Sequence, residues 1–189
     1  MRRLVIVALS ALMSVNAFAQ SFNETEPNNT RAQADTVLYA LAPPWSRVGI
    51  LNLTANDSDF FKIRLNAGDF LTAVTYPMLN DGGTPNTVMA LFDATGTTAL
   101  VFNDDIYSGV GASAIEYAAT VTGDYFLAIT GWHGPNGQDQ LNYYEGVTHG
   151  ESGSYILTVS VLFVPEPASM LALGVGLAGL VGLRRRNRK

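Results

Sequence analysis

The sequence of 189 residues contains no cysteine and only two histidines. It therefore holds no disulfide, no thiolate-ligated zinc or iron–sulfur site and no cysteine nucleophile, and histidine-rich metal chemistry is excluded as well. Apolar residues with helical spacing are also scarce. Because no such stretch is long enough for a crossover helix, a parallel α/β sheet is not expected.

Basic residues are rare between the two ends of the chain. Residues 20–164 contain four basic and fifteen acidic residues, which is a formal charge of −11. A domain this acidic repels phosphate backbones, so nucleic-acid binding is excluded. At about 150 residues per domain, the length allows one domain with appended segments.

The first 19 residues have the build of a secretory signal peptide. Arg2 and Arg3 are followed by an apolar run, residues 4–15, and by the small-residue box Ala17-Phe18-Ala19. This order is typical of an exported protein, and the apolar run is too short for a stable membrane span. We expect cleavage before Gln20.

The other end, residues 165–189, has three parts. Pro165, Glu166 and Pro167 precede an apolar run at 168–183 and a basic tail at 184–189. As a helix, the run would reach about 24 Å, slightly less than a hydrocarbon core of about 30 Å. Because a basic cluster stays cytoplasmic, we expect a membrane anchor with residues 20–164 on the outside.

This tripartite end resembles the PEP-CTERM sorting signal of Gram-negative bacteria. The resemblance implies recognition by an exosortase-type membrane enzyme and removal of the tail near Pro165-Glu166-Pro167. The precursor would be anchored in the inner membrane by its C-terminal helix, and the product delivered to the cell surface or extracellular matrix. An anchor that is never processed is the alternative.

Between the ends, apolar residues recur with a period of two. Phe61, Ile63 and Leu65 alternate with Lys62 and Arg64. Further candidate strands lie at 48–54, 70–76, 86–93, 99–103, 115–117, 125–129 and 155–161, separated by Gly, Asn and Asp turns. About eight short strands of this kind predict an all-β domain at 20–164, an antiparallel β-sandwich with jelly-roll-like connections.

The order of motifs along this domain resembles the bacterial pre-peptidase C-terminal (PPC) domain. The matching segments are NETEPNNT at 23–30, NDSDFFKI at 56–63, LFDATG at 91–96, GDYFLAI at 123–129 and GSYILTV at 153–159. The resemblance implies a β-sandwich of the kind appended to secreted peptidases and other exported proteins. Related modules in bacterial collagenases bind calcium and the extracellular substrate.

Two short segments are rich in oxygen-bearing side chains. They contain Glu24, Glu26, Asn28 and Asn29 in the first segment, and Asp57 and Asp59 in the second. Calcium takes six to eight oxygen ligands, and a divalent ion relieves repulsion among carboxylates. The resemblance implies that these six residues together build a Ca²⁺ site. The alternatives are a solvated acidic terminus with a polar turn at 57–59, and another ion.

The longest stretch without a strand pattern is the Gly-rich loop at 131–153. Its aromatic residues Trp132, Tyr143 and Tyr144 either contact sugar rings or proline-rich chains, or cover the open end of the sandwich. GESGS at 150–154 lacks the final glycine of a nucleophile elbow, and no phosphate loop or zinc-protease motif is present.

We therefore expect a non-catalytic module that contacts extracellular polysaccharide or protein. One alternative is a structural matrix protein without a discrete ligand site. The other is a secreted hydrolase whose catalytic acids belong to no recognisable motif.

Overall fold

The computed structural model describes residues 20–39, 41–79, 84–96, 98–133 and 144–163, together with 175–176 and 184. The predicted signal peptide, the Pro-Glu-Pro motif and Tyr143 lie outside these residues. Within the described part, no helix is long and apolar enough to cross a membrane.

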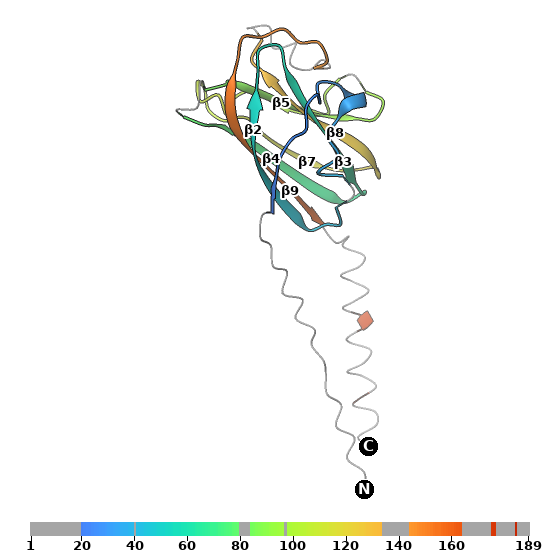
Figure 1. Ribbon diagram of the computed structural model, residues 1–189. Helices are drawn as coiled ribbons and strands as arrows, with labels where there is room; N and C mark the ends of the chain where they lie inside the picture. Colours follow the sequence, from blue (N-terminus) through green and yellow to red (C-terminus); the bar gives the residue numbers. More distant parts are fainter. Residues whose placement is uncertain are drawn as a thin grey trace.

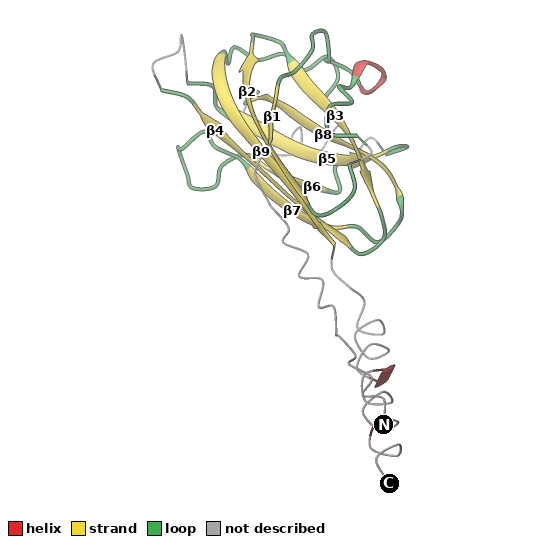
Figure 2. Ribbon diagram, turned by 60° about the horizontal axis from the view of Figure 1, so that its bottom comes forward, coloured by secondary structure: helices red, strands yellow, loops and turns green. Residues whose placement is uncertain are grey.

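Nine strands form two sheets that pack face to face (Figures 1 and 2). The five-stranded sheet contains, in spatial order, β1 (Gln20–Phe22), β2 (Trp45–Leu53), β9 (Gly153–Phe163), β4 (Asp69–Pro77) and β7 (Ala114–Ala118). The four-stranded sheet contains β3 (Ser58–Leu65), β8 (Gly123–Gly131), β5 (Thr87–Asp93) and β6 (Val101–Asn103). A short 3₁₀ helix, η1, spans Arg31–Gln33.

The strand order β2-β9-β4-β7 opposite β3-β8-β5-β6 is that of an eight-stranded jelly roll. All eight predicted strands are present, and the predicted antiparallel sandwich is confirmed. The structure adds β1, which pairs in parallel with β2 with Gln20 opposite Arg47. A three-residue strand is too short to show a period in the sequence.

The main core lies between the sheets, where alternate residues of each strand meet. Ile63 and Leu65 of β3 face Leu157 and Val159 of β9 across this core, and all four are fully buried. A second apolar cluster covers part of the outer face of the four-stranded sheet, where Tyr144 packs on strand residues. Strands β5 and β8 are therefore buried on both faces over most of their length, which explains their contiguous apolar runs, whereas β3 exposes Arg64.

The two ends of the sandwich differ. Gln20 and the last residues of β9 lie at one end, close to each other through their pairing with β2. Leu53 pairs with Gly153 at the opposite end, where β2 turns into β3 (Figure 1). The strand leading to the predicted sorting tail therefore ends far from the turn that carries Asp57.

Candidate metal centre

The N-terminal acidic segment lies beside the start of β3. The Phe60 N–H donates to the Asn28 carbonyl oxygen at 3.0 Å, and the Asp35 N–H donates to the Phe60 carbonyl at 2.8 Å. An isolated parallel bridge also joins Asp35 to Phe61. These backbone contacts hold the segment after β1 against a strand that begins more than 20 residues later in the sequence.

Three carboxylates from the two segments converge at this point. Glu24, Glu26 and Asp59 each offer one oxygen, and these oxygens lie within 4.8 Å of one another. Two ligands on opposite sides of a calcium ion, each about 2.4 Å from it, are about 4.8 Å apart. The spacing therefore fits three ligands of one ion.

Several oxygens of this cluster are buried without a hydrogen-bond partner. Asn28 and Asp59 are fully buried. The atoms without a partner are Glu24 Oε2, Asn28 Oδ1, Asn29 Oδ1 and Asp59 Oδ1. Buried polar atoms are almost always paired, because leaving one unpaired costs about 1–3 kcal/mol. A cation would provide one partner for all four.

The remaining oxygens of the carboxylates are anchored by the fold. Glu24 Oε1 accepts the Asn52 N–H of β2 at 2.8 Å, and Glu26 Oε2 accepts the Asn28 N–H at 3.1 Å. Asp59 Oδ2 accepts a hydrogen bond from the Tyr155 hydroxyl of β9. Each carboxylate thus has one oxygen that orients it and another that is available to an ion.

The cluster carries negative charge that no basic residue compensates. Burial raises the pKa of Glu24 to about 7, and the charges of Glu26 and Asp57 contribute to the same shift. Burial, and next the charge of Glu24, raises the pKa of Asp59 well above its usual range. No ion pair among the described residues reaches these side chains. A bound cation would relieve this repulsion.

Asp57 has hydrogen bonds within the β2–β3 turn that the sequence did not reveal. Its carboxylate accepts the Thr54 N–H at 3.2 Å, the Thr54 hydroxyl at 3.1 Å and the Ser58 N–H at 3.0 Å, so it holds the β2–β3 turn. It still lines a hollow of about 290 Å³ with Glu24, Glu26 and Asn29. Four of the six predicted residues thus line one hollow, and the other two, Asn28 and Asp59, are buried beside Glu26.

Sequence reasoning missed the residues that position the carboxylates. Asn52 lies 28 residues from Glu24, and Tyr155 lies 96 residues from Asp59. Tyr155 lies in a strand of alternating apolar residues, so the sequence predicts that it is a core residue. Nothing local in the sequence distinguishes its hydroxyl as the partner of a buried acid.

The two described aromatic residues of the Gly-rich loop, Trp132 and Tyr144, differ in exposure. Tyr144 is fully buried and makes an edge-on contact with Phe92 at 5.5 Å between ring centroids. The prediction that Tyr144 contacts a ligand is wrong, because its ring is buried against the outer face of the four-stranded sheet, a position that also differs from the open end of the sandwich named in the alternative. Trp132, at the end of β8, is 38% exposed.

The same loop is tied to the acidic turn. The Asn56 N–H donates to the His149 carbonyl, and the His149 N–H donates to Asn56 Oδ1, both at 3.1 Å. His149 Nε2 lies 2.7 Å from the Asp57 carbonyl oxygen. Gly131 leaves room for this ring, since a Cβ there would lie 2.3 Å from His149 Nδ1.

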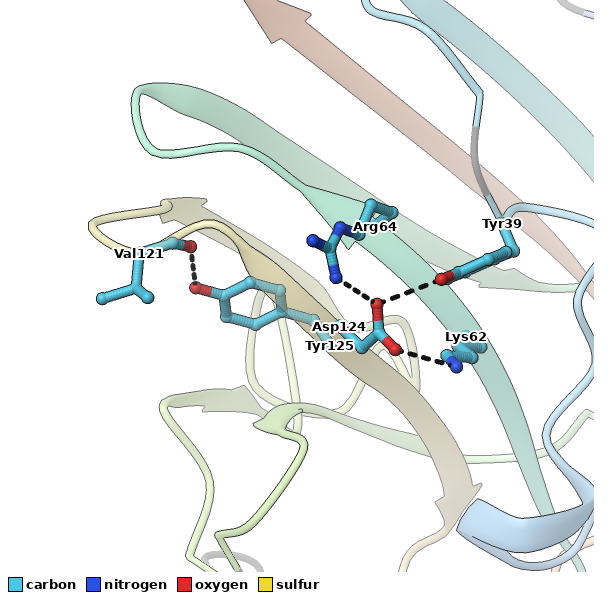
Figure 3. A network of polar contacts seen from close by, with 6 residues as sticks. All are labelled: Tyr39, Lys62, Arg64, Val121, Asp124 and Tyr125. Carbon is cyan, nitrogen blue, oxygen red and sulfur yellow. Dashed lines mark hydrogen bonds and ion pairs between the residues drawn. The ribbon is translucent and has the colours of Figure 1, made fainter.

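A second polar cluster lies on β3 and β8 and is electrostatically satisfied (Figure 3). Asp124 pairs with Lys62 and with Arg64, each at 2.8 Å, and accepts the Tyr39 hydroxyl at 3.3 Å. The hydrogen bonds from Lys62 and Arg64 lower the pKa of Asp124. This compensated carboxylate contrasts with the acidic cluster around Asp59.

Two protein-family models match the chain. The PEP-CTERM protein-sorting motif matches residues 163–186, and the bacterial pre-peptidase C-terminal domain matches residues 57–131. The chain thus contains a stretch similar to the PPC domain, followed by a match to the PEP-CTERM motif. Both resemblances noted in the sequence are confirmed. The motif implies export, a membrane-anchored precursor and processing by an exosortase-type enzyme, so the chain is an exported, surface-sorted β-sandwich.

Three proteins from other organisms are similar to parts of this chain. A probable subtilase-type serine protease of Deinococcus radiodurans is 30% identical over 105 residues, which are 56% of this chain and 14% of that protein. Aeromonas hydrophila PliG, a periplasmic inhibitor of g-type lysozyme, aligns with a TM-score of 0.44 at 16% identity, covering 76% of this chain and 96% of PliG. The PPC domain of a Bacillus anthracis collagenase aligns with a TM-score of 0.40 at 12% identity, with the same coverages.

Proposed function

We propose that this protein is a non-catalytic surface module that is stabilised by one Ca²⁺ ion and contacts polysaccharide or protein in the extracellular matrix. The observation that carries the proposal is the convergence of three carboxylates and four unpartnered buried oxygens between the N-terminal segment and β3. Glu24, Glu26 and Asp59 would hold the ion through carboxylate oxygens, and Asn28 and Asn29 through amide oxygens.

The donor set favours calcium over other cations. The unpartnered atoms of Glu24, Asn28, Asn29 and Asp59 that have a free lone pair are all oxygens, and His149 contacts the Asp57 backbone through Nε2. Hard oxygen ligands select calcium or magnesium rather than zinc or copper. Calcium tolerates irregular geometry and several carboxylates, whereas magnesium requires a near-ideal octahedron and retains most of its waters.

The ion would act as a structural link. The segment 23–30 belongs to no strand, and its carboxylates are held close to Asp59 despite their mutual repulsion. Neutralising that repulsion favours the folded state, in which the ligands are together, over the unfolded state, in which they are apart.

Thermal unfolding of residues 20–164 tests the calcium site, because all nine strands and both apolar clusters lie within residues 20–163. Calcium at about a hundredfold excess over Kd adds about 2.7 kcal/mol, which raises Tm by several degrees relative to the chelated protein. The double variant Glu24→Gln/Asp59→Asn should lose this rise. Glu116→Gln, which neutralises an exposed acid of β7, should keep it.

Calcium without effect on the Tm of the unsubstituted protein would contradict the site. So would a rise of the same size in the double variant.

Trp132 is the residue we propose for the matrix contact, because it is an exposed aromatic side chain at the end of β8. Aromatic rings in such positions stack on sugar rings and prolines. Replacing Trp132 with alanine should abolish retention of the protein on an immobilised polysaccharide that retains the unsubstituted chain. Tyr107→Ala, which removes a ring that is 74% exposed, is the matched control. Equal retention of both variants would favour a structural matrix protein without a discrete site.

A further inference from the structure

The outward surface of the five-stranded sheet has an unusual composition. On β2, β9, β4 and β7, strand register defines this outer face by sixteen residues: Ser46, Val48, Ile50, Asn52, Phe70, Thr72, Val74, Tyr76, Ala114, Glu116, Ala118, Ser154, Ile156, Thr158, Ser160 and Leu162. They alternate along each strand with the residues that face the core. Nine are apolar, five carry hydroxyl groups, Asn52 carries an amide and only Glu116 is charged.

A solvent-exposed surface would carry more charge. At the usual share of about 25–35% charged residues, about four to six of these sixteen positions would be Lys, Arg, Asp or Glu. The apolar residues form rows across the strands, since Ile156 is opposite both Ile50 and Tyr76. The domain has a formal charge of −11, yet Glu116 is the one charged residue on this face.

The two sheets differ in how their outer faces are covered. Segments around Ala34 and Tyr144 pack on the apolar outer residues of the four-stranded sheet. Neither apolar cluster of the described residues includes a residue of the outer face of the five-stranded sheet. There, Ile50 is 62% exposed, Tyr76 57% and Leu162 52%. Contiguous exposed apolar surface of this kind marks an interaction site.

We propose that this outer face binds the same face of a second copy of the chain, so that the module is a dimer formed by sheet-on-sheet packing. Two sheets stack well when their twists match, and a second copy has the same twist by definition. An isologous interface needs only one self-complementary patch. Rows of Val, Ile, Phe, Thr and Ser residues are typical of sheet faces that pack on another sheet.

The available area agrees with a dimer. Four strands about 4.8 Å apart and about eight residues long give a projected area on the order of 500 Å². Because the accessible area of a corrugated face exceeds its projection, each copy would bury close to the ~800 Å² of a standard interface.

The charge distribution gives the dimer a characteristic salt dependence. Both copies are strongly acidic, and their carboxylates lie almost entirely outside the face. Added salt screens the repulsion between the copies without weakening the apolar contact. Association should therefore become tighter as ionic strength rises, opposite to the behaviour of a contact between opposite charges.

Sedimentation velocity of residues 20–164 over a range of concentrations tests the proposal. The expected result is a monomer–dimer equilibrium whose Kd falls with added salt. Ile50→Lys and Tyr76→Lys each place an unpaired charge on the face and should raise Kd about tenfold or more. Val121→Lys is the matched control, because Val121 is 65% exposed in the turn before β8, outside the face.

A second measurement locates the interface directly. Because the chain has no cysteine, Thr158→Cys provides one spin label per copy in the middle of the face. Inter-copy distances should be short and narrowly distributed for this label, and longer for Val121→Cys. A monomer at every concentration would overturn the proposal, as would a dimer unaffected by both lysine variants. A monomer that is retained on an uncharged polysaccharide through Ile50 and Tyr76 would assign the face to a polymer instead.

Discussion

At the scale of single residues, the acidic cluster sets a pH dependence with an unusual sign. The pKa of Glu24 is about 7 in the folded protein and 4.5 when unperturbed, because burial disfavours its charged form. Between these values the folded state holds more protons than the unfolded state. The stability of the calcium-free protein is therefore expected to fall as pH rises from 4.5 to 7.

Thermal unfolding in chelator across this pH range checks the prediction. The lowered pKa of Asp124 does not change stability between pH 4.5 and 7. A carboxylate with a lowered pKa loses its stabilising effect only as pH falls through values near and below 3.8. Glu24→Gln should flatten the profile, and the rise in Tm caused by calcium should increase with pH as the ligands lose protons. A Tm that climbs with pH in chelator would show that burial does not keep Glu24 protonated in the folded state.

The residue types of the site were readable from the sequence, but their individual roles were not. Acids and amides at 24–29 and 57–59 indicated oxygen ligands, and the structure brings both segments together. Asp57 and Asp59 have the same chemistry and lie two residues apart. Only their surroundings separate a turn-holding carboxylate from one that is fully buried beside Tyr155.

At the scale of elements, the end of β8 depends on a glycine. A Cβ at Gly131 would lie 2.3 Å from His149 Nδ1 and 2.5 Å from Glu151 Cβ. Gly131→Ala is expected to destabilise the protein by about 1–3 kcal/mol, the usual cost of overpacking. Because His149 contacts the turn of Asp57, the same variant should weaken calcium binding.

Gly123→Ala, at the start of the same strand, is the matched control, since its nearest neighbour would be a Tyr125 ring carbon at 4.0 Å. Urea unfolding with and without calcium compares the two variants. Equal stability of Gly131→Ala and Gly123→Ala would show that the loop before β9 moves freely away from the turn.

Strand positions followed from period two because each strand of the sandwich buries at least one face. The same reasoning misjudged the loop at 131–153, where Tyr144 is fully buried. A tyrosine in a Gly-rich loop has no neighbours in the sequence that reveal the apolar surface of Phe92 and its cluster. Burial of that ring depends on β3 and β5, more than 50 residues away, and on β8.

At the scale of the whole molecule, the two ends of the sandwich have separate roles. β9, the strand that leads to the PEP-CTERM motif, ends at one end of the sandwich (Figure 1). The acidic cluster lies at the other end. Occupancy of the proposed calcium site should therefore not depend on the tail. The full-length chain in detergent is expected to show the same calcium-induced rise in Tm as residues 20–164. A rise that appears only after removal of the tail would indicate contact between the two ends.

The sequence by itself determined the segments that direct sorting, the all-β fold and the two acidic segments. Charge runs, apolar length and alternation are properties of contiguous residues, so they are encoded locally. The tertiary structure alone decided that Glu24 and Glu26 meet Asp59, that Tyr155 and Asn52 orient them, and that one sheet keeps an uncovered apolar face. These features arise from jelly-roll strand order and register, which bring together residues that no local pattern connects.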